Sequence, residues 1–169
     1  MTDNRFKLPY IPELDGLRGI AILDVMLFHS EVPFFKGGFI GVDIFFVLSG
    51  FLITSLLIQE YDRVGFINLK HFYMRRLLRL GPALLLLLVA FCTISFIFLS
   101  EEQAVANLVD ALIALAYLSN WARAFDFYPP DFLGHTWSLS IEEQFYILWP
   151  IILLILLRVN RNRWHIFFF

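Results

Sequence analysis

The sequence predicts an all-α fold, a polytopic bundle of four transmembrane helices with one further partial or re-entrant helix. Hydrophobic side chains make up 59% of the 169 residues, and the mean hydropathy is +0.72, well above the values of soluble domains of this length. The apolar residues also gather in four runs close to the length that crosses a hydrocarbon core, about 20 residues. The chain is therefore expected to be an integral membrane protein.

The predicted spans follow one another along the chain with short connections. The first span covers residues 14–32 and ends before Pro33, which cannot continue a helix without losing a hydrogen bond. The second span covers residues 39–58. A basic connector and helix start, residues 59–79, leads to the third span at 80–99, and the last span covers residues 141–157.

The positions of lysine and arginine predict the orientation. The connector 59–79 is basic, and the last span is followed by Arg158, Arg161 and Arg163, whereas residues 100–140 hold several acids and the single base Arg123. Cytoplasmic loops are enriched in lysine and arginine. We therefore expect the N-terminus, the connector and the C-terminal tail in the cytoplasm, and residues 100–140 outside.

The run 105–118 is predicted as the partial helix. It has about 14 residues and carries Asn107 and Asp110, which is more typical of a re-entrant or interfacial helix than of a span. If it crossed the membrane, the basic tail would lie outside, against the charge rule.

Arg18 and His29 stand out within the first predicted span. Ten residues separate them, so an unbroken helix returns both side chains to nearly the same face, roughly 16 Å apart along the axis. Ionisable groups at membrane depth usually face a bundle interior or a water-filled cavity, and they mark functional sites. The alternative is that each residue only marks one end of the helix.

Arg75, Arg76 and Arg79 form the second candidate site. Their spacings of three and four residues cluster the guanidinium groups on one side of a helix start. Guanidinium forks match the geometry of phosphate, and the positive end of the helix dipole favours an anion there. The alternative is ordinary anchoring by arginines that extend to the membrane surface.

Glu142 is the third candidate, within the segment 135–146 at the outer entry of the last span. Its plain interpretation is capping, because an acid in the first turn suits the helix dipole. The four histidines show no metal-ligand spacing, and nothing supports nucleic-acid binding. Cys92, the one cysteine, cannot form an internal disulfide.

Four segments in order carry a resemblance to a known family. They are 14–19 with His29, 41–53, 75–82 and 135–146, which read LDGLRG, GVDIFFVLSGFLI, RRLLRLGP and HTWSLSIEEQFY. Together they resemble the N-terminal half of the integral-membrane acyltransferase 3 family, bacterial O-acyltransferases that modify cell-envelope glycans. The family has about ten spans, so residues 1–169 are expected to be part of such a domain, with its C-terminal half or a separate extracytoplasmic transferase domain missing.

The resemblance implies a donor, an acceptor and roles for the candidate residues. The donor would be acyl-CoA, most commonly acetyl-CoA, and the acceptor a glycan hydroxyl; no permanently bound cofactor or metal is implied. Arg18 and His29 match the family's Arg-x10-His pair, and Glu142 matches the acid of its Glu-x-x-Phe-Tyr segment; these three are the expected catalytic residues. Arg76 and Arg79 match its Arg-x-x-Arg pair, and with Arg75 they are expected to hold the CoA phosphates. The expected location is the bacterial inner membrane.

Two other functions are compatible with the same residues. In a transporter, Arg18, His29, Asp43 and Glu142 would line an ion or proton path. In an inactive truncated remnant the residues would persist without function; the apolar residues 164–169 look like the start of a further segment.

Overall fold

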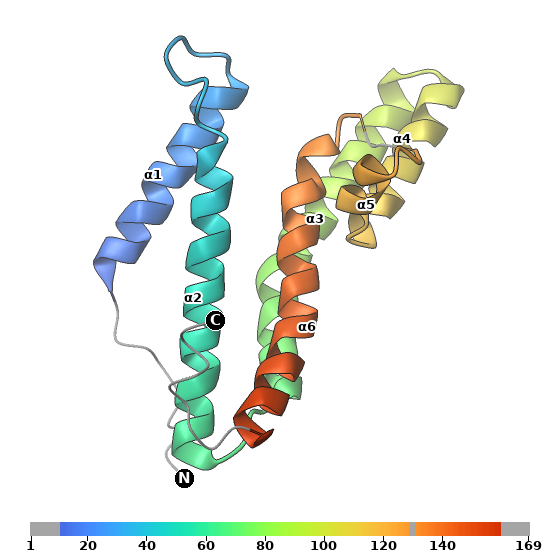
Figure 1. The fold of residues 1–169 in the computed structure, drawn as a ribbon. Helices are drawn as coiled ribbons and strands as arrows, with labels where there is room; N and C mark the ends of the chain where they lie inside the picture. The colour runs from blue at the N-terminus through green and yellow to red at the C-terminus, as the bar shows by residue number, and fades with distance from the viewer. Residues whose placement is uncertain (1–10, 129–130, 160–169) are drawn as a thin grey trace. The chain divides into compact units, whose positions relative to one another are not determined.

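All regular secondary structure in residues 11–128 and 131–159, which a computed structural model describes, is helical (Figure 1). The elements are α1 (Pro12–His29), α2 (Ile40–Val64), α3 (Leu69–Phe98), α4 (Glu101–Leu115), α5 (Ser119–Ala124), the 3-10 turn η1 (Gly134–Thr136) and α6 (Trp137–Val159). The predicted all-α class is confirmed. Arg161, Arg163 and the predicted apolar start at 164–169 lie outside the described residues.

Within the described ranges, three helical stretches are long and apolar enough to cross a membrane. They are Ile40–Val64, Leu69–Phe98 and Gly134–Val159, in which an 18-residue window has a mean hydropathy of 2.2, 2.5 and 1.6 respectively. They account for the predicted second, third and last spans. The predicted first span corresponds to α1, which has only 18 residues and carries Glu13, Asp15, Arg18 and Asp24, so it is not among the three. The predicted partial helix corresponds to α4, whose 15 residues extend about 22 Å, less than the hydrocarbon thickness of about 30 Å.

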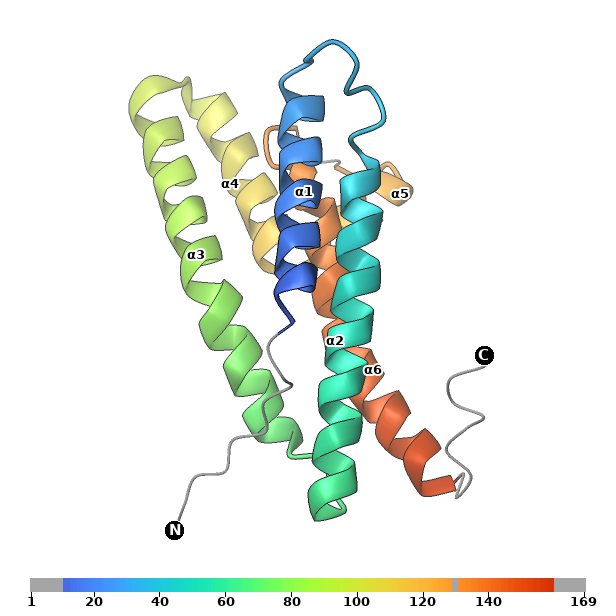
Figure 2. The ribbon, with the colours of Figure 1, turned by 90° about the vertical axis from the view of Figure 1, so that its left-hand side faces the viewer.

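The chain divides into two compact units, each described here by itself. One comprises the described parts of residues 1–67 and 152–169, and the other comprises residues 68–151. In the first unit, α1 and α2 form an antiparallel hairpin, and the two helices run side by side (Figures 1 and 2).

Two glycines allow α1 and α2 to approach closely. A Cβ on Gly38 would overlap the backbone oxygen of Asp24, and a Cβ on Gly41 would overlap the backbone oxygen of Ala21 and lie 2.8 Å from Cγ2 of Val25. Small residues at a membrane helix interface let backbones come together in this way. The hairpin therefore depends on the absence of side chains at these positions.

The predicted connector 59–79 is shorter in the structure, because helix takes up most of it. Gly65 ends α2 in the left-handed conformation, with φ +78°, which glycine adopts without steric cost. Asn68 then caps α3 by accepting a hydrogen bond from the N–H of His71 at 3.0 Å. Only residues 65–68 separate the two helices, so the predicted phosphate-binding arginines lie inside α3.

In the second unit, α3 and α4 form a helical hairpin with a two-residue link. Ser100 starts α4 with a capping box, in which its side chain and that of Gln103 satisfy each other's backbone N–H groups. A small apolar core joins the hairpin to the segment before η1. Its buried members are Leu84, Leu88, Ala111, Ala114 and Leu133.

Helix α6 runs antiparallel to α3 within this unit. The Tyr73 hydroxyl donates to the backbone oxygen of Ile147 at 2.8 Å, and toward the other end Phe91 and Leu139 pack against the same apolar core. Residues early in α3 therefore lie beside the middle of α6, and residues later in α3 lie beside its start, which determines which side chains can meet.

We expect Gly41→Ala to destabilise the α1–α2 hairpin, because its Cβ would push the two backbones apart. The expected loss is about 1–3 kcal/mol, typical of overpacking, and thermal unfolding of the protein in detergent would measure it. Gly19→Ala on α1 is the matched control: nothing lies within 4 Å of its Cβ, so its unfolding temperature should stay unchanged or rise. Equal effects of the two variants would contradict the close approach.

Candidate functional site

Arg18 and His29 lie on one unbroken helix, as predicted. They occupy α1 with His29 as its last residue, so the two side chains share nearly the same face, about 16 Å apart along the axis. Arg18 is partly buried and pairs with Asp15 one turn earlier at 3.5 Å. The structure thus gives Arg18 a local partner on its own helix.

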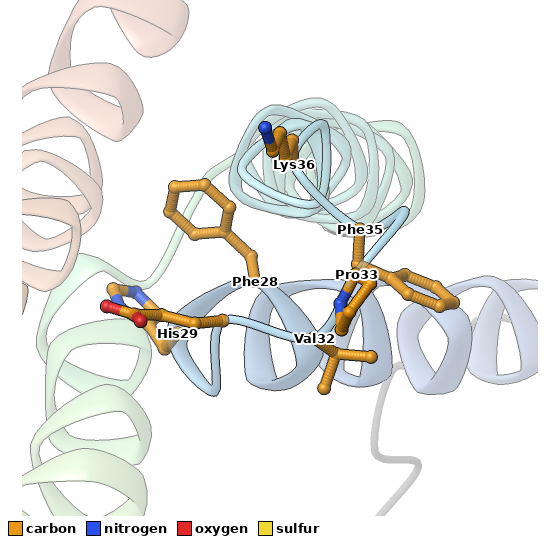
Figure 3. A pocket seen from close by; sticks show the side chains of 7 residues that line it. Phe28, His29, Val32, Pro33, Phe35 and Lys36 are labelled. Carbon is orange, nitrogen blue, oxygen red and sulfur yellow. The ribbon is translucent and has the colours of Figure 1, made fainter.

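His29 is exposed and lines an open pocket of about 540 Å³ between the end of α1 and the loop that follows. Figure 3 shows Phe28 and His29 projecting from the end of α1, with Lys36 carried by the loop. The His29 ring meets Phe28 edge-on at 5.4 Å, and Phe28 meets Phe39 at 6.1 Å. These ring contacts fix the histidine against the start of α2 while leaving it accessible to a ligand.

The three predicted arginines divide between two environments. Arg75 and Arg79 are exposed on α3, and the Arg75 guanidinium lies 3.0 Å from Nδ1 of His71. Arg76 instead points at α6: its guanidinium carbon stands 5.0 Å from the centre of the Tyr146 ring and 5.7 Å from that of Phe72. Such a cation over an aromatic face is attracted by the ring quadrupole. Arg75 and Arg79 therefore keep their charge available at the surface, whereas Arg76 is engaged inside the unit.

Tyr146 connects Arg76 to Glu142. Its ring lies under the guanidinium, and its hydroxyl donates to Oε1 of Glu142, one turn earlier on α6. The carboxylates of Glu142 and Glu143 also act electrostatically on Arg76. The structure therefore brings one predicted arginine together with the predicted acid.

This pairing differs from the placement expected from the sequence, which sets the arginines and Glu142 at opposite ends of their spans. Because α3 begins at Leu69, Arg76 lies about 10 Å inside it. The antiparallel register then brings Arg76 level with Tyr146. For the same reason the helix dipole, which acts within the first turn, contributes little at Arg76.

Glu143 and Gln144 were not among the predicted site residues. Oε1 of Glu143 is buried without a hydrogen-bond partner among the described residues. Gln144 donates to the backbone oxygen of Tyr117 at 2.7 Å and exchanges hydrogen bonds with Asn120 at 3.0 Å, which ties α5 to α6. Burial raises the pKa of the Tyr117 hydroxyl, and the charge of Glu143 raises it further. The sequence feature that could have identified Glu143 and Gln144 is the run of three consecutive polar residues, 142–144, inside an apolar helix.

The arrangement offers an anion site, a cation–carboxylate cluster and an accessible imidazole. Exposed Arg75 and Arg79 can bind phosphate groups, and His29 presents its imidazole at the pocket after α1. Among the described residues, no group of three or more histidine, cysteine or acidic side chains could hold a metal ion.

Comparisons with known proteins agree on one family. The family model described as "Acyltransferase domain" matches residues 11–169. A Staphylococcus aureus (strain COL) protein named "Putative O-acetyltransferase SACOL0978" is 46% identical over 171 residues, covering 96% of this chain and 28% of that protein. "O-acetyltransferase OatA" of S. aureus (strain NCTC 8325) is 45% identical over 160 residues, covering 91% of this chain and 26% of that protein.

The chain thus spans little more than a quarter of the length of these curated relatives. No solved structure matches it.

We expect Tyr146→Phe to lower the stability of the second unit by about 1–3 kcal/mol, because it removes the hydroxyl that donates to partly buried Glu142. Thermal unfolding in detergent would measure the loss. Tyr128→Phe is the control, because Tyr128 is exposed and its hydroxyl should matter little. An unchanged unfolding temperature for Tyr146→Phe would show that the Tyr146–Glu142 bond does not stabilise the unit.

Proposed function

The chain belongs to the acyltransferase 3 family of integral-membrane enzymes, and on that premise we propose that it transfers an acetyl group from acetyl-CoA to a hydroxyl of a cell-envelope glycan. The observation that carries the donor half of the proposal is the division of the arginine cluster. Arg75 and Arg79 are exposed, while Arg76 is held against α6 by Tyr146 and the Glu142 carboxylate.

Arg75 and Arg79 hold the CoA phosphates in this proposal. They lie four residues apart on α3, so their guanidinium groups project from neighbouring positions of one face. Each can form bidentate hydrogen bonds to phosphate. Arg76 adds positive charge beside them, but its main contacts are aromatic and acidic side chains of its own unit, which suits it to positioning the site.

His29 is the proposed general base. Its nitrogen takes the proton of the acceptor hydroxyl as that oxygen attacks the thioester carbonyl; the carbon–sulfur bond then breaks, and the CoA thiolate leaves and receives the proton. Arg18 shares the face of α1 with His29 and would guide the pantetheine arm along that wall. Glu142 is the third proposed catalytic residue, and its carboxylate is held by the Tyr146 hydroxyl.

The proposed location is the bacterial inner membrane. The basic residues of the connector 59–79 and of the tail that begins at Arg158 favour a cytoplasmic N-terminus. Acetyl-CoA would then be bound from the cytoplasmic side, and the glycan would be reached from outside.

Donor binding tests the first half of the proposal. We expect purified chain in detergent to bind radiolabelled acetyl-CoA saturably and Arg79→Ala to weaken this binding about tenfold or more, because each hydrogen bond to a charged group is worth about 1.5–3 kcal/mol. Lys70→Ala, an exposed cation on the first turn of the same helix, is the matched control and should bind normally. A double variant, Arg76→Ala with Arg79→Ala, should lose binding altogether. Acetyl-CoA binding that survives in the double variant would rule out the arginine site. Protection of the protein against unfolding by a gradient-coupled solute, and not by acetyl-CoA, would favour a transporter.

Transfer by membranes containing the full-length protein tests the second half. We expect His29→Ala to slow acetyl transfer to the glycan about 10²- to 10⁴-fold, the usual contribution of a general base, while acetyl-CoA binding stays unchanged. Phe34→Ala, fully exposed in the loop after α1, is the control and should transfer normally. Unchanged transfer by His29→Ala would remove the base role.

A further inference from the structure

A second cavity lies in the second unit and shares no lining residue with the candidate site. It is open, has a volume of about 420 Å³ and is lined by residues that follow α3, belong to α4 or precede η1: Leu99, Gln103, Ala106, Asn107, Asp110, Tyr128, Asp131 and Phe132. Ligand sites typically range from about 300 to 1,000 Å³. The cavity is therefore large enough for a small ligand or for one unit of a polymer.

The α4 wall of this cavity carries hydrogen-bonding groups held in place by other contacts. Nδ2 of Asn107 donates to Oγ of Ser95 at 2.9 Å, so its Oδ1 is not used in that bond and can accept. Oε1 of Gln103 serves the capping box, so its Nε2 remains able to donate. Both residues line the cavity. The wall thus combines a fixed acceptor with a fixed donor.

Asp110 is a buried lining residue of the cavity. It is 5% exposed, and its Oδ2 accepts the backbone N–H of Asp131 at 3.1 Å, which ties Asp131 to α4. Burial raises the pKa of the Asp110 carboxyl, the hydrogen bond from Asp131 partly offsets this rise, and the negative charge of Asp131 adds to it. A carboxyl that takes up a proton more readily can donate as well as accept a hydrogen bond.

Two exposed aromatic rings line the same cavity. Tyr128 is 48% exposed and Phe132 is 67% exposed, and Phe132 is tilted against Phe91 at 6.5 Å. Tyr128 also has a φ of +48°, an unfavourable conformation for an aromatic residue that recurs at ligand clamps. The rings offer flat apolar faces beside the hydrogen-bonding wall.

The charge of the lining restricts the ligand. Its ionisable side chains are Asp110, Asp131 and Tyr128, with no lysine, arginine or histidine among the residues that form it. Phosphate and carboxylate ligands are therefore disfavoured by repulsion. Hydroxyl groups, which both donate and accept, match the mixed wall, and the C–H faces of a sugar ring match the aromatic side chains.

We propose that this cavity binds a neutral sugar unit and serves as a subsite for the glycan acceptor. The acceptor role of the cavity rests on the proposed function. Sugar binding by the cavity rests on its lining residues alone. The cavity is lined mostly by residues of 100–140, which the charge pattern predicts on the outer side of the membrane, where a glycan would be met.

Calorimetric titration of the purified chain in detergent tests the proposal with defined probes. We expect at least one of two neutral tetrasaccharides, N-acetylchitotetraose or maltotetraose, to bind, and the anionic tetragalacturonate to bind at least about tenfold more weakly. Phe132→Ala and Tyr128→Ala should each weaken binding about twofold to tenfold, the usual range for an aromatic contact. Phe127→Ala, 50% exposed and outside the lining, is the matched control and should bind as the unchanged chain does.

Choline chloride and acetyl-CoA complete the design. Binding of choline in preference to both tetrasaccharides would identify the ligand as an organic cation and overturn the proposal. The absence of tetrasaccharide binding would also overturn it, and so would a loss of affinity in Phe127→Ala equal to that in the two lining variants. Sugar binding without acetyl-CoA binding would support the subsite while contradicting the acetyl-CoA donor. Acetyl-CoA binding lost in Arg79→Ala, without sugar binding, would support the donor site and overturn the subsite.

Discussion

Placing an arginine inside an apolar helix is the constraint on which the second unit depends. A guanidinium group cannot be left without partners in a low-dielectric environment, because the cost of desolvating it is several kcal/mol. Arg76 meets this requirement across the helix pair, over the Tyr146 ring and near the carboxylate that Tyr146 binds. This contact joins α3 to α6 beside partly buried Glu142, and the hydrogen bond from Tyr73 supports the same register.

The contact also separates two kinds of arginine that share one motif. Arg75 and Arg76 are adjacent along the helix, so their side chains project about 100° apart. Arg76 lies against α6, and Arg75 and Arg79 are exposed. In electrostatic terms, the inner arginine is offset by acidic neighbours, and the outer two keep their charge at the surface. Three arginines that form a single cluster in the sequence therefore divide between an inner contact with α6 and an exposed face of α3.

Local patterns in the sequence were sufficient to predict the helical class, three of the spans and the partial helix α4, because hydropathy and length decide these features. The first predicted span is present as the helix α1, whose four charged residues keep it out of the three candidate spans. The contact between Arg76 and Tyr146 could not be predicted from local patterns, because the two residues are 70 positions apart. It also depends on where α2 ends, at Gly65, and where α3 is capped, at Asn68. The second cavity was hidden for a similar reason: Asp110 and Asp131 come together only through a loop whose course no periodicity describes.

The short links between neighbouring helices have a consequence for biosynthesis. The chain's principal helix contacts join sequence neighbours, α1 with α2 and α3 with α4, and the second link is only two residues long. Each hairpin can therefore close as soon as its second helix has left the ribosome, before later segments are made. Each of the two helices with more charged or polar residues, α1 and α4, is thus paired early with the longer apolar helix beside it.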